Sequence, residues 1–514
     1  MTSASNDSLY ILVKSLSKSE KRQFKLYVNR LGVNADAKFL ALFNLLDKMS
    51  VYNEKDILSS GIVKKQQLSN LKAHLYKQIL ISLRLNPVNQ NIRIQIREQL
   101  DFATILYQKG LYKQSLKILD KAKSMAIANQ EKVIAYEIVE LEKVIETQYI
   151  TRSISGRADE LAVQAKELSQ QNVLTSKLSN LSLQLYGIML KFGYVKNDEE
   201  FQLVSDYFNA HLPEFDRSKL GFREKLWYYK AWLWYSFLTQ DFLSCFKYAK
   251  KWVDLFYENE SMIYLNPVFF LKGNNYLLET MYYVKSRTGF KDSLERLEKT
   301  IADKRFPSND NLSVLAFMYV NSNKLNLHFL EGSFEEGLKL EKPILSGLKN
   351  HGNKIDEHHV MVFYYKLACM YFGAGDNKSC ITYLKKIIEN KNLTMREDLM
   401  CFARVLNLVA HYDAGLDYHL EVQLKSTYKF LLKMNDLHEV QKEMIKFLRN
   451  LGDIFPHELK DEFKKLHTRL KEYEDHPYER RAFLYLDIIS WLESKIENRP
   501  VGEIIREKAA VLIR

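Results

Sequence analysis

The chain has 514 residues, which is too long for one ordinary hydrophobic core and indicates several domains or one elongated repeat array. Hydrophobic residues make up 46% and charged residues 27%, a balance that excludes a wholly disordered chain. The 8 prolines and 18 glycines are far fewer than average contents of roughly 5% and 7% would give. Because long helices exclude both residues from their interiors, this scarcity predicts an all-α fold.

The net charge of +12 is concentrated at the N-terminal end. Residues 1–99 carry 16 Lys and Arg against 7 Asp and Glu, which leaves only +3 for the rest of the chain. A local excess of positive charge favours polyanions or acidic proteins as partners.

No stretch predicts a membrane span or a secretory leader. Leu9–Val13 is too short for a leader, and the most apolar stretch, Leu226–Tyr235, is interrupted by Lys230. We therefore expect a cytoplasmic protein without membrane insertion. The cysteines lack C-x-x-C spacing, which predicts small buried residues in a reducing compartment. They are Cys245, Cys369, Cys380 and Cys401.

The pattern of apolar and capping residues in residues 1–93 predicts a basic N-terminal module of helices. Ser17-Lys-Ser-Glu20 has the form of a capping box, so a helix is expected to begin there and to end at Gly32. Phe39–Leu46 predicts a second amphipathic helix, and Asn53 is placed to cap a short third one.

A long fourth helix is expected over Leu68–Leu83, between a turn at Gly61 and a stop at Asn86-Pro87. The order of a short helix, a turn and a long basic helix resembles a helix-turn-helix, whose basic side chains contact phosphates. The candidate contacts to a polyanion or an acidic partner are Arg22, Lys25, Lys64, Lys65, Lys72, Lys77 and Arg84.

The helical phase of these basic residues argues against DNA readout as the first interpretation. Lys77 and Arg84 point away from the leucine stripe, but Lys65 and Lys72 lie beside it, where their stems would cover the core. Nothing after Arg84 has the pattern of the β-hairpin of a winged helix. A basic cap or an acidic-partner surface is therefore favoured, and nucleic-acid binding stays open.

From residue 94 to 455 the pattern changes to pairs of antiparallel helices joined by tight turns. The clearest pair spans Phe102–Ala122, with Ala103 where two helices cross, Gly110 in the turn and Tyr112 at the start of the second helix. This stretch resembles a tetratricopeptide (TPR) motif. The resemblance implies a right-handed α-solenoid of TPR-like hairpins after the N-terminal module.

The same frame recurs downstream in lengthened, degenerate copies. Its positions are Phe242 and Cys245 with Gln240 in place of the glycine, then Gly332, Phe334 and Gly337, then Ala368, Tyr371, Gly375, Cys380 and Leu384, and finally Gly415, Leu420 and Leu424. The last three turn glycines are 43 and 40 residues apart, whereas a regular TPR repeats every 34 residues. Residues 456–514, with helices near 457–474 and 478–496, are expected to form a polar C-terminal cap.

The whole chain also resembles a bacterial group of TPR-like proteins with a basic N-terminal helical module. The residues that carry this resemblance are Ser17–Tyr27, Leu68–Leu85 and Leu424–Phe430. It implies no particular activity.

No catalytic or cofactor motif occurs, so we expect neither an enzyme nor a cofactor or metal site. His358-His359 follows Asp356-Glu357, and a solvated helix start explains the four residues better than a metal cluster does. The aromatic residues of Trp227–Tyr235 could stack nucleobases, but at helical spacing they more often fill the core.

These observations predict a non-enzymatic adaptor or scaffold that binds a protein or peptide through a TPR-like superhelix. Residues that could line its groove are Asn321, Asn323, Lys324, Tyr364 and Lys366. The alternative is a nucleic-acid-binding regulator, with residues 1–93 on the nucleic acid and the array as a sensor or dimerisation surface.

Overall fold

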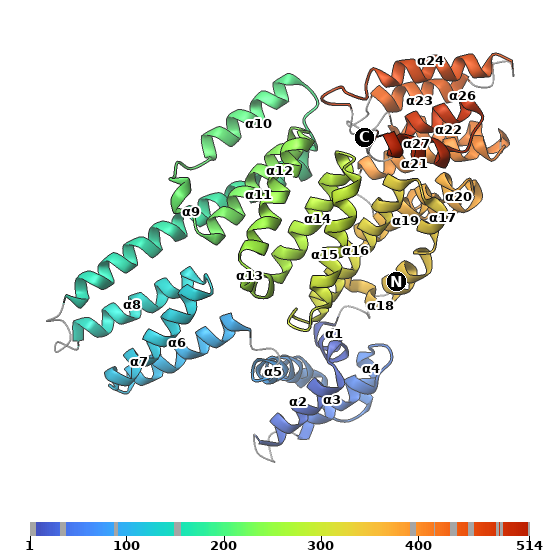
Figure 1. Ribbon diagram of the computed structural model, residues 1–514. Helices are drawn as coiled ribbons and strands as arrows, with labels where there is room; N and C mark the ends of the chain where they lie inside the picture. Colours follow the sequence, from blue (N-terminus) through green and yellow to red (C-terminus); the bar gives the residue numbers. More distant parts are fainter. Residues whose placement is uncertain are drawn as a thin grey trace. The chain divides into compact units, whose positions relative to one another are not determined.

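The computed structural model describes residues 7–30, 37–86, 91–148, 156–390, 397–415, 417–431, 439–450, 457–479, 483 and 487–511. All regular structure in these ranges is helical, as expected for an all-α protein. The chain forms two compact units, Met1–Ser169 and Gln170–Arg514, and helix α9 (Arg157–Phe192) runs through the boundary (Figure 1). The boundaries predicted near residues 93 and 455 stay predictions.

Five helices form the N-terminal part of the first unit: α1 (Ser8–Ser15), α2 (Lys18–Arg30), α3 (Ala37–Lys48), α4 (Glu54–Ser59) and α5 (Lys65–Arg84). The capping box is confirmed, because Glu20 N donates to Ser17 Oγ (3.2 Å) and Ser17 N donates to Glu20 Oε2 (2.8 Å). The predicted cap of α4 is also confirmed, since Asn53 Oδ1 accepts from Lys55 N (3.1 Å). Gly32 and Pro87, the predicted helix stops, lie outside the described residues.

The remaining helices of the first unit pack as neighbours in chain order: α6 (Ile92–Gln108), α7 (Tyr112–Ala128) and α8 (Lys132–Gln148), followed by the start of α9. Ala103 is fully buried where α6 meets α7, and Ser115 Oγ donates to its carbonyl oxygen (2.8 Å). Small residues at this crossing let the two backbones approach, as the sequence predicts.

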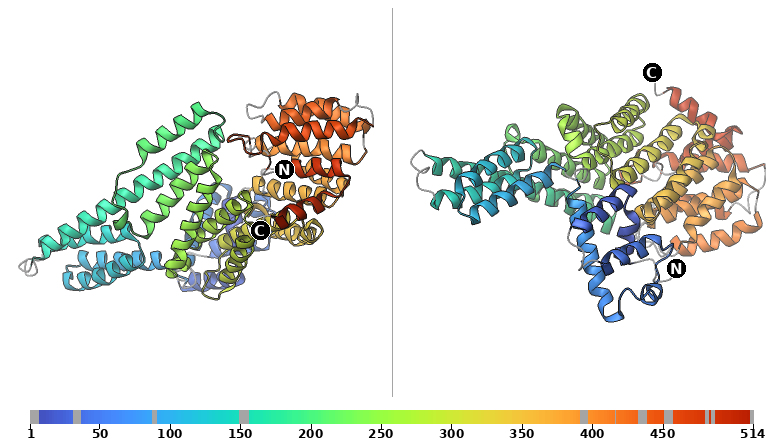
Figure 2. Two further views of the ribbon diagram at one scale, coloured as in Figure 1. Left: turned by 45° about the horizontal axis from the view of Figure 1, so that its top comes forward. Right: turned by 90° about the horizontal axis from the view of Figure 1, so that it is seen from below.

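The second unit repeats this arrangement over many helices. After the end of α9 it contains α10 (Asp198–His211), α11 (Phe222–Leu238), α12 (Phe242–Glu258), α13 (Ser261–Leu265), α14 (Pro267–Tyr283), α15 (Arg287–Ala302), α16 (Asp310–Glu331), α17 (Phe334–Leu338), α18 (Glu341–His351), α19 (Glu357–Gly373), α20 (Asn377–Ile388), α21 (Glu397–Asp413), α22 (Asp417–Leu431), α23 (Glu439–Asn450), α24 (Leu459–Lys471), α26 (Ile488–Glu497) and α27 (Val501–Val511). Most helices pack on a chain neighbour, and α12, α14, α16 and α19 pack on one another in turn. The result is a solenoid-like stack (Figure 1, Figure 2).

The turns between paired helices share one backbone motif. A residue with positive φ follows each first helix, and the next N–H donates to the carbonyl five residues earlier, as from Leu111 N to Leu106 O (2.9 Å). This is a Schellman turn, which satisfies carbonyls at a helix end. Such positive-φ turn residues are Gly110, Gln130, Gln240, Lys285, Gly332 and Gly375. The TPR frame predicts the glycine turns and the one at Gln240, but it marks no turn at Gln130 or Lys285.

Replacing Lys285 with glycine is expected to stabilise the protein by about 0.5–1 kcal/mol. A non-glycine residue with positive φ destabilises the folded state by about 1–2 kcal/mol, and glycine removes this strain. Glycine also gives the unfolded chain more conformational freedom, which offsets part of the gain. Gln240→Gly is the matched contrast: it also relieves a positive φ, but it removes the hydrogen bond from Gln240 Nε2 to Val195 O (2.9 Å). Thermal denaturation should show a higher Tm for Lys285→Gly only; a lower Tm for that variant would contradict the strain argument.

Two regions of the second unit add detail to the expected helices. In the copy of the frame at Phe334, the second helix is divided into α17 and α18, because Pro343 has no N–H to donate to Lys339 O. Of the helix expected near 478–496, residues 480–482 and 484–486 lie outside the described residues, and helix α26 begins at Ile488, where Asp487 Oδ1 accepts from Ser490 N (2.9 Å). A further helix, α27, follows and packs against α16.

Candidate functional site

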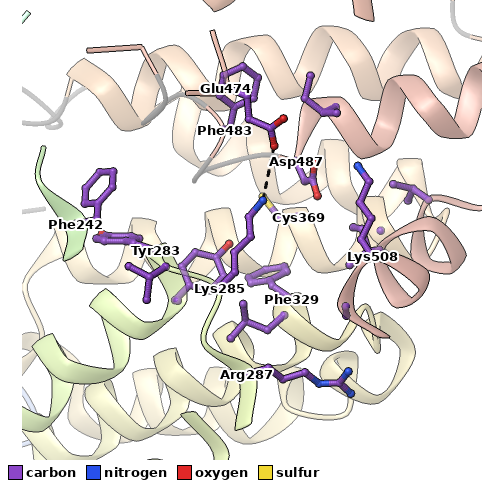
Figure 3. A pocket seen from close by; sticks show the side chains of 18 of the residues that line it. Phe242, Tyr283, Lys285, Arg287, Phe329, Cys369, Glu474, Phe483, Asp487 and Lys508 are labelled. Carbon is purple, nitrogen blue, oxygen red and sulfur yellow. Dashed lines mark ion pairs between the residues drawn. The ribbon is translucent and has the colours of Figure 1, made fainter. Parts of the chain in front are cut away.

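The larger of two adjoining cavities in the second unit has a volume of about 500 Å³ and is called here the C-terminal cavity (Figure 3). The C-terminal ends of α14, α16 and α19 form one side, and α26 and α27 form the other. Its floor is apolar and aromatic: Phe242 and Tyr283 lie 5.2 Å apart between ring centroids, and Phe329 and Phe334 lie 6.3 Å apart.

The Phe334 ring in this wall packs against two glycines that leave space for it. A Cβ atom on Gly373 would lie 2.4 Å from the ring, and a Cβ atom on Gly502 would lie 3.3 Å from it. A third glycine, Gly332, approaches Gly502 so closely that its own Cβ would lie 3.0 Å from the Gly502 carbonyl oxygen. The turn after α16, helix α19 and helix α27 can therefore meet at Phe334 only because these positions lack side chains.

The rim of the C-terminal cavity carries charges of both signs. Lys285 Nζ lies 3.9 Å from Glu474 Oε1, and Arg287 lies 3.7 Å from Glu331 Oε1. Lys508 Nζ lies 2.5 Å from Glu493 Oε2. Solvent-accessible pairs contribute little to stability, so Lys285 and Arg287 are available to orient a charged ligand or partner.

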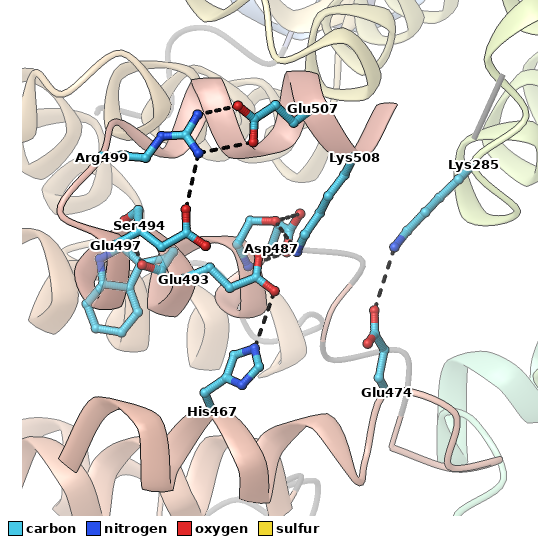
Figure 4. A network of polar contacts seen from close by, with 12 residues as sticks. Lys285, His467, Glu474, Asp487, Glu493, Ser494, Glu497, Arg499, Glu507 and Lys508 are labelled. Carbon is cyan, nitrogen blue, oxygen red and sulfur yellow. Dashed lines mark hydrogen bonds and ion pairs between the residues drawn. The ribbon is translucent and has the colours of Figure 1, made fainter. Parts of the chain in front are cut away.

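A polar network connects α24, α26 and α27 (Figure 4). Glu493 of α26 contacts both Lys508 of α27 and His467 of α24, the latter at 3.3 Å from Nε2. Arg499, between α26 and α27, pairs with Glu497 (3.2 Å), Glu503 (3.5 Å) and Glu507.

The segment after α24 connects this wall to the earlier repeats. Tyr478 Oη donates to Asp198 Oδ1 (2.5 Å), and Gln240 Nε2 donates to the Tyr478 carbonyl oxygen (3.3 Å). The hydrogen bond to Asp198 raises the pKa of Tyr478 to about 12, so the phenol stays a donor at neutral pH.

The smaller cavity, called here the Lys366 cavity, has a volume of about 280 Å³ and lies among α14, α16 and α19. Lys366 Nζ donates to Ser322 O (3.2 Å), Ser322 Oγ (2.7 Å) and Asn326 Oδ1 (2.6 Å). Asn326 Nδ2 donates to Asn323 Oδ1 (3.1 Å), and Asn323 Nδ2 donates to Asn275 Oδ1 (2.9 Å). A chain of neutral amides therefore leads from the ammonium group across α16 to α14.

The ammonium group of Lys366 is desolvated. Burial lowers the pKa of Lys366 to about 8, although the negative charge of Glu279 opposes the shift. Glu279 also lines the Lys366 cavity and accepts a hydrogen bond from Tyr283 Oη (2.5 Å). Among the residues that the structure describes, neither Lys366 nor Glu279 has an oppositely charged partner within ion-pairing distance.

Two of the five residues proposed from the sequence to line a groove, Asn323 and Lys366, line the Lys366 cavity. The other three point elsewhere. Asn321 Nδ2 donates to Phe317 O (2.8 Å), Lys324 pairs with Glu298 (2.6 Å), and Tyr364 packs beside Tyr383. No sequence signal indicated Glu279, because a glutamate in a helix is ordinarily solvated.

The two cavities share part of a wall. Phe242, Tyr282, Tyr283, Phe329 and Cys369 line both. Burial raises the pKa of Cys369 to about 12, which keeps it a thiol and a poor nucleophile. All four cysteines are buried, as the sequence predicts.

The seven basic candidates of residues 1–93 do not form one uniform surface. Arg22, Lys64, Lys65 and Lys77 are exposed and form no ion pair with any described residue. The other three already have contacts inside the first unit. Lys25 Nζ lies 5.8 Å from the Phe43 ring centroid, Lys72 Nζ lies 2.9 Å from Asp7 Oδ2, and Arg84 lies 3.0 Å from Asp101 Oδ2.

Lys72 is the most constrained of these three. Desolvation lowers its pKa, but hydrogen bonds to Tyr52 and Asp7 outweigh that effect and leave the pKa raised. Lys72 therefore serves the packing of α1 on α5. Whether residues 1–93 bind a polyanion or an acidic partner stays a prediction.

Two other sequence features have structural roles. Asp356 caps α19 by accepting from His359 N (3.0 Å), which confirms a helix start at these residues. The aromatic residues near Trp227 belong to the core of the second unit, where Trp232 stacks on Tyr248 at 5.1 Å. No group of three or more metal-ligating side chains occurs in the described ranges, and no helix there is long and apolar enough to cross a membrane.

No family model matches this chain, and no curated protein matches it. The two cavities must therefore be interpreted from their geometry.

Proposed function

We propose that the chain is a cytoplasmic, non-enzymatic adaptor or scaffold that binds a protein or peptide through a TPR-like, right-handed superhelix. The observation that carries the proposal is the C-terminal cavity, an aromatic pocket with a mixed-charge rim set into a stack of helical hairpins. Hairpins with small crossing residues and Schellman turns support the TPR-like character of the array. The resemblance to bacterial TPR-like proteins agrees with it.

The dimensions and lining of the C-terminal cavity suit an apolar anchor. Its volume of about 500 Å³ falls within the range of about 300–1,000 Å³ that is typical of ligand pockets. Protein interfaces obtain much of their binding energy from one or a few large side chains that fill such a pocket. Lys285 and Arg287 on one side and Asp487 on another would orient the partner through charges beside that anchor.

The chemistry of the lining favours binding over catalysis. Cys369, the only thiol among the lining residues that the structure describes, is held protonated by its raised pKa. The Lys508 ammonium group already pairs with Glu493 and donates a hydrogen bond to Ser490 Oγ (2.9 Å). These contacts stiffen the wall instead of presenting a reactive group.

A negative charge on the rim at Leu243 is expected to weaken partner binding by at least about tenfold. Leu243 lines the C-terminal cavity and is 72% exposed, so Leu243→Glu should leave the fold intact. Leu203→Glu on α10 is the matched control, because Leu203 is 64% exposed and does not line the cavity. Quantitative affinity capture with full-length protein should recover a partner with wild type and Leu203→Glu, and at least about tenfold less with Leu243→Glu. Equal recovery by all three, or no specific protein with wild type, would overturn the proposal.

A further inference from the structure

The Lys366 cavity contains two opposite charges that do not pair with each other. Lys366 comes from α19 and Glu279 from α14, and both line the cavity. Each is held by neutral groups instead: Ser322 and Asn326 accept from the ammonium, and Tyr283 donates to the carboxylate. A desolvated ammonium group is costly unless it is paired, so a cavity that keeps Lys366 apart from Glu279 is suited to a ligand that supplies a counter-charge to each.

The rest of the lining restricts what such a ligand can be. Met318, Phe329 and Phe363 provide apolar surface, while Asn275 and Asn323 provide amide donors and acceptors. The volume of about 280 Å³ lies just below the range of about 300–1,000 Å³ for ordinary ligand pockets, which favours a small metabolite over a peptide chain. An inorganic anion would satisfy Lys366 but would be repelled by Glu279 and would leave the apolar surface empty.

We propose that the Lys366 cavity is a binding site for a small apolar α-amino acid in its zwitterionic form. The ligand carboxylate pairs with Lys366, and its ammonium group pairs with Glu279. Its side chain packs on Met318, Phe329 and Phe363. This site is separate from the protein-binding surface proposed above and does not depend on it.

The position of Tyr283 would connect this ligand to the C-terminal cavity. Its hydroxyl donates to Glu279, and its ring packs 5.2 Å from Phe242 in the wall that both cavities share. A ligand ammonium on Glu279 would therefore lie beside a side chain that also lines the larger cavity.

The test is calorimetric titration of the full-length protein with L-leucine, L-methionine and L-phenylalanine, each up to about 1 mM. At least one should bind. Its N-acetyl derivative, which lacks the ammonium group, and its amide, which lacks the carboxylate, should each bind about tenfold to hundredfold more weakly, because each loses a charge-assisted contact. Lys366→Met and Glu279→Gln should weaken binding by similar factors. Lys324→Met should bind as wild type does, since Lys324 lies on α16 but pairs with Glu298 and does not line the cavity.

Three results would overturn the proposal: no binding of any of the three amino acids, derivatives that bind as tightly as the parent, or folded Lys366→Met and Glu279→Gln proteins with wild-type affinity. Circular dichroism establishes whether the variants fold. If Lys366→Met does not fold, Glu279→Gln and the derivative series on wild type still decide the question. Loss of this site leaves partner capture through Leu243 unaffected, so the two proposals fail separately.

Discussion

Replacing Lys123 with methionine is expected to destabilise the first unit by about 3–5 kcal/mol at neutral pH, because it removes one partner of a buried ion pair. Lys123 Nζ lies 2.5 Å from Glu142 Oε2, and Glu142 is fully buried between α7 and α9. Burial raises the pKa of Glu142 even with Lys123 present. Arg157, at 3.4 Å from Glu142 Oε1, is shared with Asp120 and Glu160 and compensates only in part. Hydrogen exchange of peptides from α7 and α8 should report the loss directly.

The pH dependence and a double variant separate this explanation from simple loss of packing. Because the pKa of Glu142 is raised above 4.5 in the folded state, the folded protein keeps that proton to a higher pH than the unfolded chain does. The penalty of Lys123→Met should therefore be small near pH 4.5, grow as the pH rises through the wild-type folded-state pKa of Glu142, and level off only above the higher folded-state pKa that Glu142 has in the variant. Lys123→Met with Glu142→Met should return to within about 1 kcal/mol of wild type. A penalty that is independent of pH and persists in the double variant would contradict the ion-pair explanation.

Phe334→Ala is expected to lower the free energy of unfolding of the second unit by about 3–5 kcal/mol, because it leaves a cavity between Gly373 and Gly502. Hydrogen exchange in α27 and the thermal transition of the full chain should both report this loss. Phe192→Ala is the control: Phe192 is 63% exposed, and its removal should change stability by no more than about 0.5 kcal/mol. If α27 keeps wild-type protection in Phe334→Ala, the ring is not what holds α27 in place.

The local elements of the fold could be predicted because their signals lie within a few residues of each other. The capping box at Ser17 and Glu20 and the cap at Asn53 involve neighbours in the chain. The turn glycine at Gly110 likewise depends on local backbone geometry. The turns at Gln130 and Lys285 could not be predicted, since tertiary packing imposes a positive φ that neither side chain favours.

The candidate sites depend on contacts that the sequence alone does not reveal. The positive charge of residues 1–99 is visible in the sequence, but the pairing of Lys72 with Asp7, 65 positions away, and of Arg84 with Asp101 is not. Lys366 and Asn323 could be proposed for a groove, because side chains of the first helix of each TPR-like hairpin line the concave surface of such an array. Glu279 could not, because its role depends on α14 and α19 lying on either side of α16.

The contact between Gly332 and Gly502 has a consequence for how the second unit comes apart. Arrays in which each repeat touches only its neighbours fray from their ends, one repeat at a time. Here the turn at Gly332 lies against the first turn of α27 at Gly502, 170 residues later in the chain, so the C-terminal helices are attached to the middle of the array. The helices between Gly332 and Gly502 therefore have no free terminus from which unfolding could spread. Residues 332–502 should accordingly melt as one cooperative block, and removal of α27 should convert that single transition into a gradual one.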